Sequence, residues 1–188
     1  KEIISRHPDQ DIIYLGDTKR FPYGSKSREN IIDFTKKGMD FLIEKGVKMV
    51  VIACGTATSQ ALEAVKKCYD TPIIGIIDET VKYVSEKGYK NIGVIATAGT
   101  IRSKEWQNRL YSSIPDAVVN DKACPLLAPM AEEGWVRNEV ARLTIKEYLK
   151  DMKDEDCLIL GCTHFPLFSD FIAKNKQIIC NSKSAIIM

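Results

Sequence analysis

Two short apolar runs in this chain each lead to a cysteine that is followed at once by a threonine-containing turn. The first reads Met-Val-Val-Ile-Ala-Cys-Gly-Thr over residues 49–56, and the second reads Cys-Leu-Ile-Leu-Gly-Cys-Thr-His over residues 157–164. Such short runs of Val, Ile and Leu are typical of strands buried on both faces of a parallel sheet. In open α/β sheets the active crevice lies beyond the carboxyl ends of the strands. The runs therefore predict a parallel α/β fold with Cys54 and Cys162 at that edge.

A cysteine at the end of a strand can also have a purely structural role. Cysteine is among the most buried residue types and often packs as a small apolar side chain. The repetition argues against this interpretation, because Ala53 and Gly161 leave space beside the two thiols. Thr56 and Thr163 place hydroxyl groups just after them. We expect two facing thiols that act as an acid–base pair on the two faces of one carbon atom.

Strand-like and helix-like segments alternate along the rest of the chain, which is the pattern of α/β proteins. The apolar runs predict strands at 12–15, 49–53, 73–77, 92–95, 117–119, 157–160 and 177–180. Helical periodicity predicts helices at 30–45, 59–69, 79–87, 104–112, 138–150 and 167–174. Ser103 is expected to cap the helix at 104–112, and the segment 123–130 has no regular pattern.

Two loops have the composition of binding loops. The loop at 16–24 is long for a strand–helix connection and mixes Pro, Gly, Tyr and charged residues. Its Pro-Tyr-Gly end is equally compatible with a plain turn. The loop at 96–100 reads Ala-Thr-Ala-Gly-Thr and precedes a helix, which suits a carboxylate or phosphate ligand, although many strand–helix turns share this composition.

The composition excludes several classes of protein. A net charge of +2 gives no argument for binding nucleic acid or a membrane surface. No apolar run approaches the roughly 20 residues that span a bilayer. The six cysteines form no Cys-x-x-Cys pair, and with two histidines the spacing of zinc ligands is absent. We expect a cytoplasmic protein with free thiols, no metal, and no nucleic-acid or membrane partner.

Four segments together resemble bacterial glutamate racemases. They are Tyr-Leu-Gly-Asp-Thr-Lys-Arg-Phe-Pro-Tyr-Gly at 14–24, Val-Ile-Ala-Cys-Gly-Thr-Ala-Thr at 51–58, Ala-Cys-Pro-Leu-Leu-Ala-Pro-Met-Ala-Glu at 123–132 and Leu-Gly-Cys-Thr-His-Phe-Pro-Leu at 160–167. The resemblance implies an α/β fold with two pseudo-symmetric domains, mostly parallel sheets, and the active site in the cleft between them. It implies a first domain at 1–77, a second at 78–183, and at 184–188 the start of a segment returning to the first.

The resemblance also implies an activity, namely interconversion of L- and D-glutamate without pyridoxal phosphate, metal or other cofactor, to supply D-glutamate for peptidoglycan. One cysteine thiolate removes the α-proton and the opposite thiol delivers a proton to the other face. By motif position, Cys54 serves D-glutamate, Cys162 serves L-glutamate, and His164 assists Cys162. The implied substrate-binding residues are Pro22, Tyr23, Gly24, Gly55, Thr56, Thr97, Thr100, Glu132 and Thr163. A homodimer is expected.

The chain departs from the family's pattern at several places. The family's opening strand and its Asp-Ser-Gly-x-Gly-Gly loop do not occur here, and we expect them in a segment preceding Lys1. Gly55 stands where the family has asparagine, and Cys180-Asn181-Ser182 stands where it tends to have Ile-Asp-Ser. Two alternatives follow: an aspartate or other cofactor-independent amino-acid racemase, and a truncated protein of racemase fold with impaired catalysis.

Overall fold

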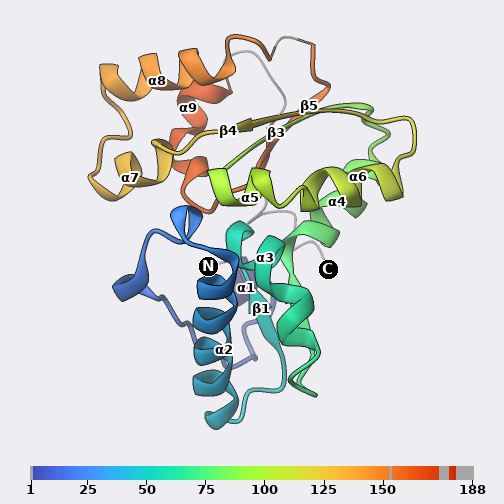
Figure 1. The fold of residues 1–188 in the computed structure, drawn as a ribbon, viewed down its shortest axis with the longest axis vertical. Coiled ribbons are helices and arrows are strands. Elements are labelled where there is room, and N and C mark those ends of the chain that lie inside the picture. Colours follow the sequence, from blue (N-terminus) through green and yellow to red (C-terminus); the bar gives the residue numbers. More distant parts are fainter. Residues whose placement is uncertain (1, 153, 174–177, 181–188) are drawn as a thin grey trace.

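The computed structural model describes residues 2–152, 154–173 and 178–180. Within these residues the strands form a two-stranded sheet and a four-stranded sheet, and all pairings are parallel. Figure 1 shows the two-stranded sheet with its helices below and the four-stranded sheet with its helices above. We call residues 2–75 the lower part and the described residues from 76 onward the upper part. The predicted α/β class with parallel sheets is confirmed.

The lower part packs two helices against one face of its sheet. Strands β1 and β2 pair with Val50 beside Ile73, and the apolar sides of α2 and α3 cover Val50 and Ile52. Ser27 caps α2, because its hydroxyl accepts a hydrogen bond from the Asn30 N–H. The elements are α1 (Glu2–Arg6), η1 (Thr18–Arg20), η2 (Tyr23–Ser25), α2 (Arg28–Glu44), β1 (Val50–Ile52), α3 (Gly55–Lys66) and β2 (Ile73–Gly75).

The upper part has a sheet covered on both faces. Its strand order is β4-β3-β5-β6, and every residue of β5 is buried. The elements are α4 (Ile76–Glu86), β3 (Asn91–Ala96), α5 (Ala98–Arg102), α6 (Glu105–Ser113), β4 (Val118–Ala123), α7 (Leu127–Glu132), α8 (Glu139–Leu149), β5 (Cys157–Leu160), η3 (Phe165–Phe168), α9 (Ser169–Ile172) and β6 (Ile178–Cys180).

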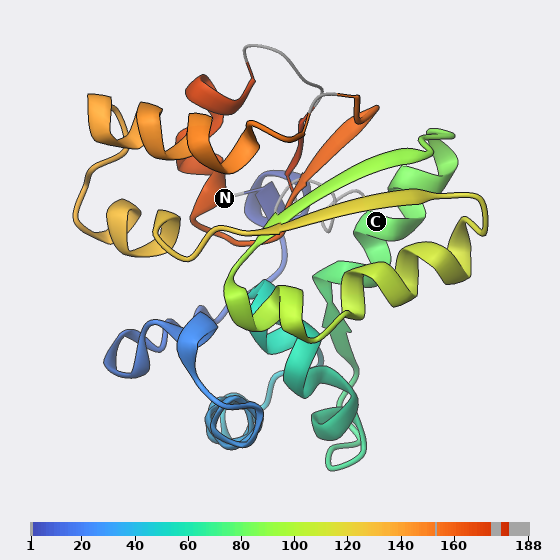
Figure 2. The same cartoon turned by 45° about the horizontal axis from the view of Figure 1, so that its top comes forward.

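Side-chain alternation along β5 divides the upper core into two layers. Leu158 and Leu160 pack with the buried side chains of α7, α8 and α9. Cys157 and Ile159 point to the opposite face and pack with those of α4 and α6. Figure 2 shows α7, α8 and α9 on one side of the sheet and α4 and α6 on the other.

Two predictions about strands in the lower part are wrong. Val51, in the middle of β1, is 38% exposed, so β1 is buried on one face and not on both. The reason is that α2 and α3 pack on the same side of the sheet. The segment 12–15 is not a strand, because no strand in the described chain pairs with it, and Tyr14 there is 89% exposed.

Several helices and strands begin or end at residues other than those predicted. Helix α3 begins at Gly55, four residues early, because Cys54 caps it, and the strand predicted at 73–77 ends at Gly75, where α4 begins. Ser103 follows α5 as its C-terminal cap, and its hydroxyl also accepts a hydrogen bond from the Glu105 N–H at 3.4 Å at the start of α6, although the N-cap position of α6 is Lys104; the N-cap of α5 is Thr97. Strand β4 extends to Ala123, the segment 123–130 contains the start of α7, and the helix predicted at 167–174 is divided into η3 and α9. The segment 184–188 lies outside the described residues.

Candidate active site

The first cysteine lies at the carboxyl end of β1 and begins a helix. The Cys54 sulfur accepts a hydrogen bond from the Ala57 N–H at 3.5 Å, which makes Cys54 the cap of α3. Burial raises the pKa of the Cys54 thiol, and hydrogen bonds from the backbone of Ala57 and from Thr56 act against this rise. A helix N-terminus favours a thiolate, whereas burial favours the protonated thiol. The position therefore suits a sulfur that holds its proton and can still ionise during a reaction.

The second cysteine follows β5, one residue after the strand ends. The Cys162 side chain is buried, and burial raises its pKa to about 12. Charge on Cys54 raises it further, whereas the backbone N–H groups of His164 and Phe165 lower it. The two sulfurs therefore influence each other's ionisation across the two parts of the molecule. Both thiols keep their protons at neutral pH in this state.

A histidine connects Cys162 to a carboxylate. The Cys162 sulfur lies 3.7 Å from His164 Nδ1, and His164 Nε2 lies 2.5 Å from Glu132 Oε1. The Phe21 ring packs beside the imidazole, with the ring centroids 5.4 Å apart. Imidazole can accept a thiol proton at one nitrogen while the carboxylate stabilises the positive charge at the other. The imidazole of His164, supported by the Glu132 carboxylate, can therefore move a proton to or from the Cys162 sulfur.

Three threonine hydroxyls meet between the two parts. Thr56 Oγ1 lies 3.0 Å from Thr97 Oγ1 and 3.1 Å from Thr100 Oγ1, and the last two lie 2.9 Å apart. All three side chains are buried. Thr56 comes from α3 in the lower part, whereas Thr97 and Thr100 come from the end of β3 and from α5 in the upper part. The cluster offers hydroxyl donors to a carboxylate that replaces their mutual hydrogen bonds.

The loop at 16–24 lies against this threonine cluster. The Tyr23 hydroxyl donates to Asp17 Oδ2 at 2.6 Å, and Arg20 Nη1 donates to the same oxygen at 2.8 Å. Burial and the bond to Asp17 raise the pKa of Tyr23. A Cβ atom on Gly24 would lie 2.5 Å from the Thr97 Cβ, so the loop backbone touches the upper part where a side chain has no room. The loop is thus ordered by polar contacts and is more than a plain turn.

The structure brings together most of the residues that the sequence singled out. Thr163 is the exception, because its side chain is exposed at the surface, whereas the hydroxyls of Thr56, Thr97 and Thr100 are buried. Pro22 is partly buried in the loop beside Tyr23. Asp17 and Arg20 were not predicted as site residues, although both lie within the 14–24 motif. No sequence pattern indicated that Asp17 would bind a tyrosine six residues later.

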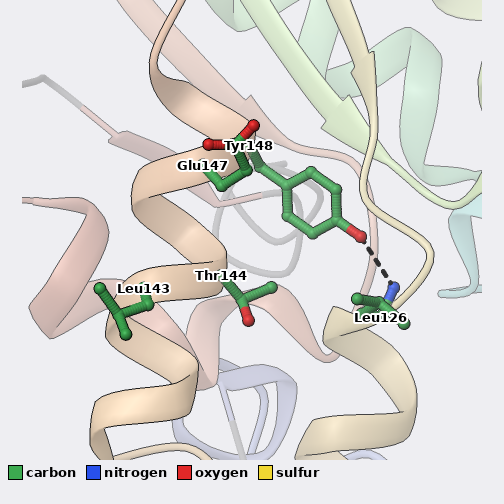
Figure 3. A pocket seen from close by; sticks show the side chains of 5 residues that line it. All are labelled: Leu126, Leu143, Thr144, Glu147 and Tyr148. Atoms are coloured by element: carbon green, nitrogen blue, oxygen red, sulfur yellow. Dashed lines mark hydrogen bonds between the residues drawn. The ribbon is translucent and has the colours of Figure 1, made fainter.

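A separate pocket lies on the outer face of the upper part (Figure 3). Its walls come from α8 and from the residue before α7, and the Tyr148 oxygen accepts a hydrogen bond from the Leu126 N–H at 3.3 Å. Because neither cysteine lines it, this pocket is not the candidate active site. The lining residues are Leu126, Leu143, Thr144, Glu147 and Tyr148.

No group of three or more His, Cys, Asp or Glu side chains is placed to hold a metal ion among the residues that the structure describes. Within the same residues, no helix is long and apolar enough to cross a membrane.

Comparison with known proteins gives a consistent result. Residues 1–183 match the Asp/Glu/Hydantoin racemase family. The chain is 44% identical over 169 residues to a glutamate racemase of Aquifex aeolicus, which covers 89% of this chain and 66% of the relative. It is 41% identical over 179 residues to a glutamate racemase of Geobacter metallireducens, covering 93% and 66%. The chain thus spans about two thirds of the length of these relatives.

A solved structure is also similar. The glutamate racemase of Francisella tularensis in complex with D-glutamate superposes with a TM-score of 0.93 at 37% sequence identity. The match covers 98% of this chain and 72% of that chain.

Proposed function

The chain belongs to the Asp/Glu/Hydantoin racemase family, and we propose that it interconverts L- and D-glutamate with two thiols on opposite faces of the α-carbon. The observation that carries this proposal is the meeting of the two cysteine loops. Gly55, which follows Cys54, lies directly against Gly161, which precedes Cys162. One ligand placed between these loops has a sulfur from each part of the molecule within reach.

The proposed reaction moves two protons and needs no redox partner. In one direction the Cys54 thiolate takes the α-proton of D-glutamate, and the electron pair of the broken C–H bond stays on the α-carbon. The Cys162 thiol then delivers its proton to the opposite face, which yields L-glutamate. Cys54 ends as a thiol and Cys162 as a thiolate, so the reverse reaction begins from the state in which the forward reaction ends.

Ionisation of one thiol is the step that burial of the site opposes, because burial raises the pKa of both thiols. We propose that His164 accepts the Cys162 proton at Nδ1 while Glu132 holds the other side of the ring. For Cys54 the supporting groups are the backbone and hydroxyl donors of Thr56 and the N–H of Ala57. We propose that the substrate carboxylates bind at the hydroxyls of Thr56, Thr97 and Thr100, which lie within hydrogen-bond distance of one another.

The broader organisation is proposed on the same basis. We assign a first domain to 1–77 and a second to 78–183, and the apolar cores of the two sheets, which share no residue in the described chain, support a division near this point. The proposed setting is a cytoplasmic homodimer that supplies D-glutamate for peptidoglycan. Pro22, Tyr23 and Gly24 are proposed to border the substrate, since the loop that carries them touches Thr97.

The test is the replacement of each thiol by a hydroxyl. Cys54→Ser and Cys162→Ser should each abolish racemisation in both directions, because serine is far too weakly acidic to replace a thiolate base. Circular dichroism of L- and D-glutamate solutions measures the conversion, and the far-ultraviolet spectrum of each variant reports its fold. Cys68→Ser, at an exposed position, is the matched control and should retain the wild-type rate.

Two outcomes would contradict the proposal. One is a single variant at Cys54 or Cys162 that keeps near-wild-type turnover, because the two-base reaction needs both sulfurs. The other is a wild-type chain that converts aspartate but not glutamate, because that result would assign a different substrate.

A further inference from the structure

The loop at 16–24 belongs to the lower part, but one of its side chains packs against the upper part. Phe21 contacts the apolar core cluster that contains Leu127, Cys162 and Phe165. Its ring also lies beside the His164 imidazole, with the ring centroids 5.4 Å apart and the ring planes inclined by 45°. This separation is normal for two aromatic rings in contact. Through Phe21, the lower part therefore touches the side chain that serves the Cys162 thiol.

The backbone of Phe21 is held to the lower part by contacts on both sides of it. Arg20 and Tyr23 both donate hydrogen bonds to the Asp17 carboxylate. Both also contact the Phe34 ring of α2, where the Arg20 guanidinium carbon lies 5.0 Å from the ring centroid and the Tyr23 ring centroid lies 5.9 Å from it. These contacts fix the loop on α2, while the Phe21 side chain packs in the other direction, against the upper core.

The His164 imidazole has polar neighbours at its two nitrogens and an apolar neighbour beside the ring. Cys162 faces Nδ1 and Glu132 faces Nε2, whereas Phe21 packs against the ring itself. The His164 side chain is 24% exposed and that of Glu132 is 52% exposed. Loss of the Phe21 ring would admit water to the imidazole. Water would compete for the ring nitrogens and weaken the attraction between an imidazolium and the carboxylate.

From these contacts we propose that Phe21 is a positioning residue whose ring covers the His164 imidazole, excludes water from it and holds it beside the Cys162 thiol. This inference rests on the proposed function. Phe21 does not contact the reacting atoms in this role, because it acts through His164. Since Phe21 directly precedes the Pro-Tyr-Gly segment, the loop proposed to border the substrate also completes the surroundings of this imidazole.

Phe21→Ala should slow the half-reaction that uses Cys162. Without the ring, His164 is freer to turn and accepts the Cys162 proton less readily. We expect α-proton exchange from L-glutamate to slow by about tenfold, the size of effect often found when a supporting side chain is removed. Exchange from D-glutamate, which begins at Cys54, should slow much less. Phe21→Leu keeps an apolar side chain over the imidazole and should retain most of the wild-type rate for both enantiomers.

The NMR signal of the imidazole provides a readout that does not depend on activity. The sequence has two histidines, and His7→Gln leaves His164 as the single imidazole. The ring current of a phenyl group shifts the signals of protons near it. At one fixed pH, the Hε1 signal of His164 should therefore move in Phe21→Ala and in Phe21→Leu, because both remove the phenyl ring.

Phe171→Ala is the matched control. Phe171 lies on α9, is partly buried, and packs against the same core cluster as Phe21. Its truncation removes a phenyl ring from that cluster and leaves the contact between Phe21 and His164 in place. We expect it to change neither the exchange rates nor the Hε1 signal.

The experiment measures α-proton exchange from each enantiomer in deuterated solvent, the His164 Hε1 signal and far-ultraviolet circular dichroism for wild type and the three variants. The inference is supported by a loss of exchange from L-glutamate that is selective for Phe21→Ala in a folded chain, together with a displaced Hε1 signal. Unchanged exchange from L-glutamate in this variant overturns it, as does an Hε1 signal that does not move.

Other results would assign Phe21 a different role and thus also overturn the inference. Equal losses for the two enantiomers would assign it to the substrate loop as a whole. An equal loss in Phe171→Ala would assign it to general packing of the core, and so would a Phe21→Ala chain that does not fold. If wild type exchanges the α-proton of neither enantiomer, the proposed function fails, and the Hε1 signal alone decides whether Phe21 covers His164.

Discussion

His164 lies between the Cys162 thiol and the Glu132 carboxylate, and its two ring nitrogens face one group each. The two contacts fix the orientation of the ring, because a flip about the Cβ–Cγ bond would put ring carbon atoms where Nδ1 and Nε2 now lie. Glu132 is about half-exposed and comes from the end of α7, 32 residues earlier in the chain. A contact of this kind contributes through geometry and charge, and its removal should alter proton transfer more than stability.

Glu132→Gln is the test at the level of single residues. The amide keeps the shape of the side chain but places no negative charge beside the His164 ring. We expect a drop of about tenfold in turnover, the size of effect often found when a supporting carboxylate is lost. The loss should be larger for α-proton exchange from L-glutamate than from D-glutamate, measured by NMR in deuterated solvent. Glu133→Gln, at the neighbouring exposed position, should retain both rates, and equal losses for the two enantiomers would contradict the assignment of His164 to Cys162.

Sequence patterns located the chemical groups of the site but not their partners. Cys54 and Cys162 were predicted from the strands that precede them, Thr56 from its position just after Cys54, and Thr97 and Thr100 from the resemblance. The bond between Tyr23 and Asp17 depends on how the loop folds back, and no periodicity encodes it. Thr163 is the converse case, because its position after Cys162 suggests a site residue while the start of η3 leaves its side chain exposed.

Elements were predicted well where local signals and packing agree. The strand at Cys157–Leu160 has the predicted bounds because it is central in its sheet and apolar throughout. The segment at 12–15 has the same kind of sequence but no strand beside it in the described chain, so its pattern alone does not make a strand. At 96–103 several hydroxyl residues compete as caps, and Thr97 caps α5 although Ser103 has the same chemistry.

Helix α8 offers a test at the level of an element. The Asn138 side chain accepts a hydrogen bond from the Ala141 N–H at 2.9 Å and thus satisfies one of the free donors at the helix start. Asn138→Ala should lower the free energy of unfolding by about 1 kcal/mol. Asn138→Asp should restore most of it, because aspartate is an equally good cap. Urea denaturation measures both, and an Ala variant as stable as the Asp variant would mean that the cap does not contribute.

The described part of the molecule consists of two apolar cores in the upper part, a third in the lower part, and a contact between the parts that combines polar groups with the packing of Phe21 against an upper core. Arg109 of the upper part reaches Glu63 of the lower part at 3.0 Å, and Asp78 and Glu105, which belong to its own part, lie 3.4 Å and 2.7 Å from it. The alternation of strands and helices predicted the parallel sheets. It could not predict that Gly55 would meet Gly161, because the approach of two loops from different sheets depends on the docking of whole helices.

The buried thiols make the free energy of unfolding change with pH in the alkaline range. Burial raises the pKa of Cys124, Cys157 and Cys162 to about 12 each, against an ordinary value of 9.0. Below about pH 9 these thiols are protonated in both the folded and the unfolded chain, so they do not change the free energy of unfolding with pH. Above this pH the unfolded chain releases protons that the folded chain still holds, and the free energy of unfolding falls as the pH approaches 12.

Urea denaturation between about pH 8 and about pH 10.5 tests this dependence, and Cys157→Ala isolates one thiol. Cys157 packs between β5 and the helices α4 and α6, away from the candidate site, so its replacement does not alter the proposed bases. The variant should be less stable than wild type at neutral pH because of the cavity, by about 1–2 kcal/mol, yet lose less stability as the pH rises. Cys68→Ser, whose thiol is exposed, should follow the wild-type curve. Parallel curves for Cys157→Ala and wild type would show that the folded chain does not hold the Cys157 proton more tightly than the unfolded chain.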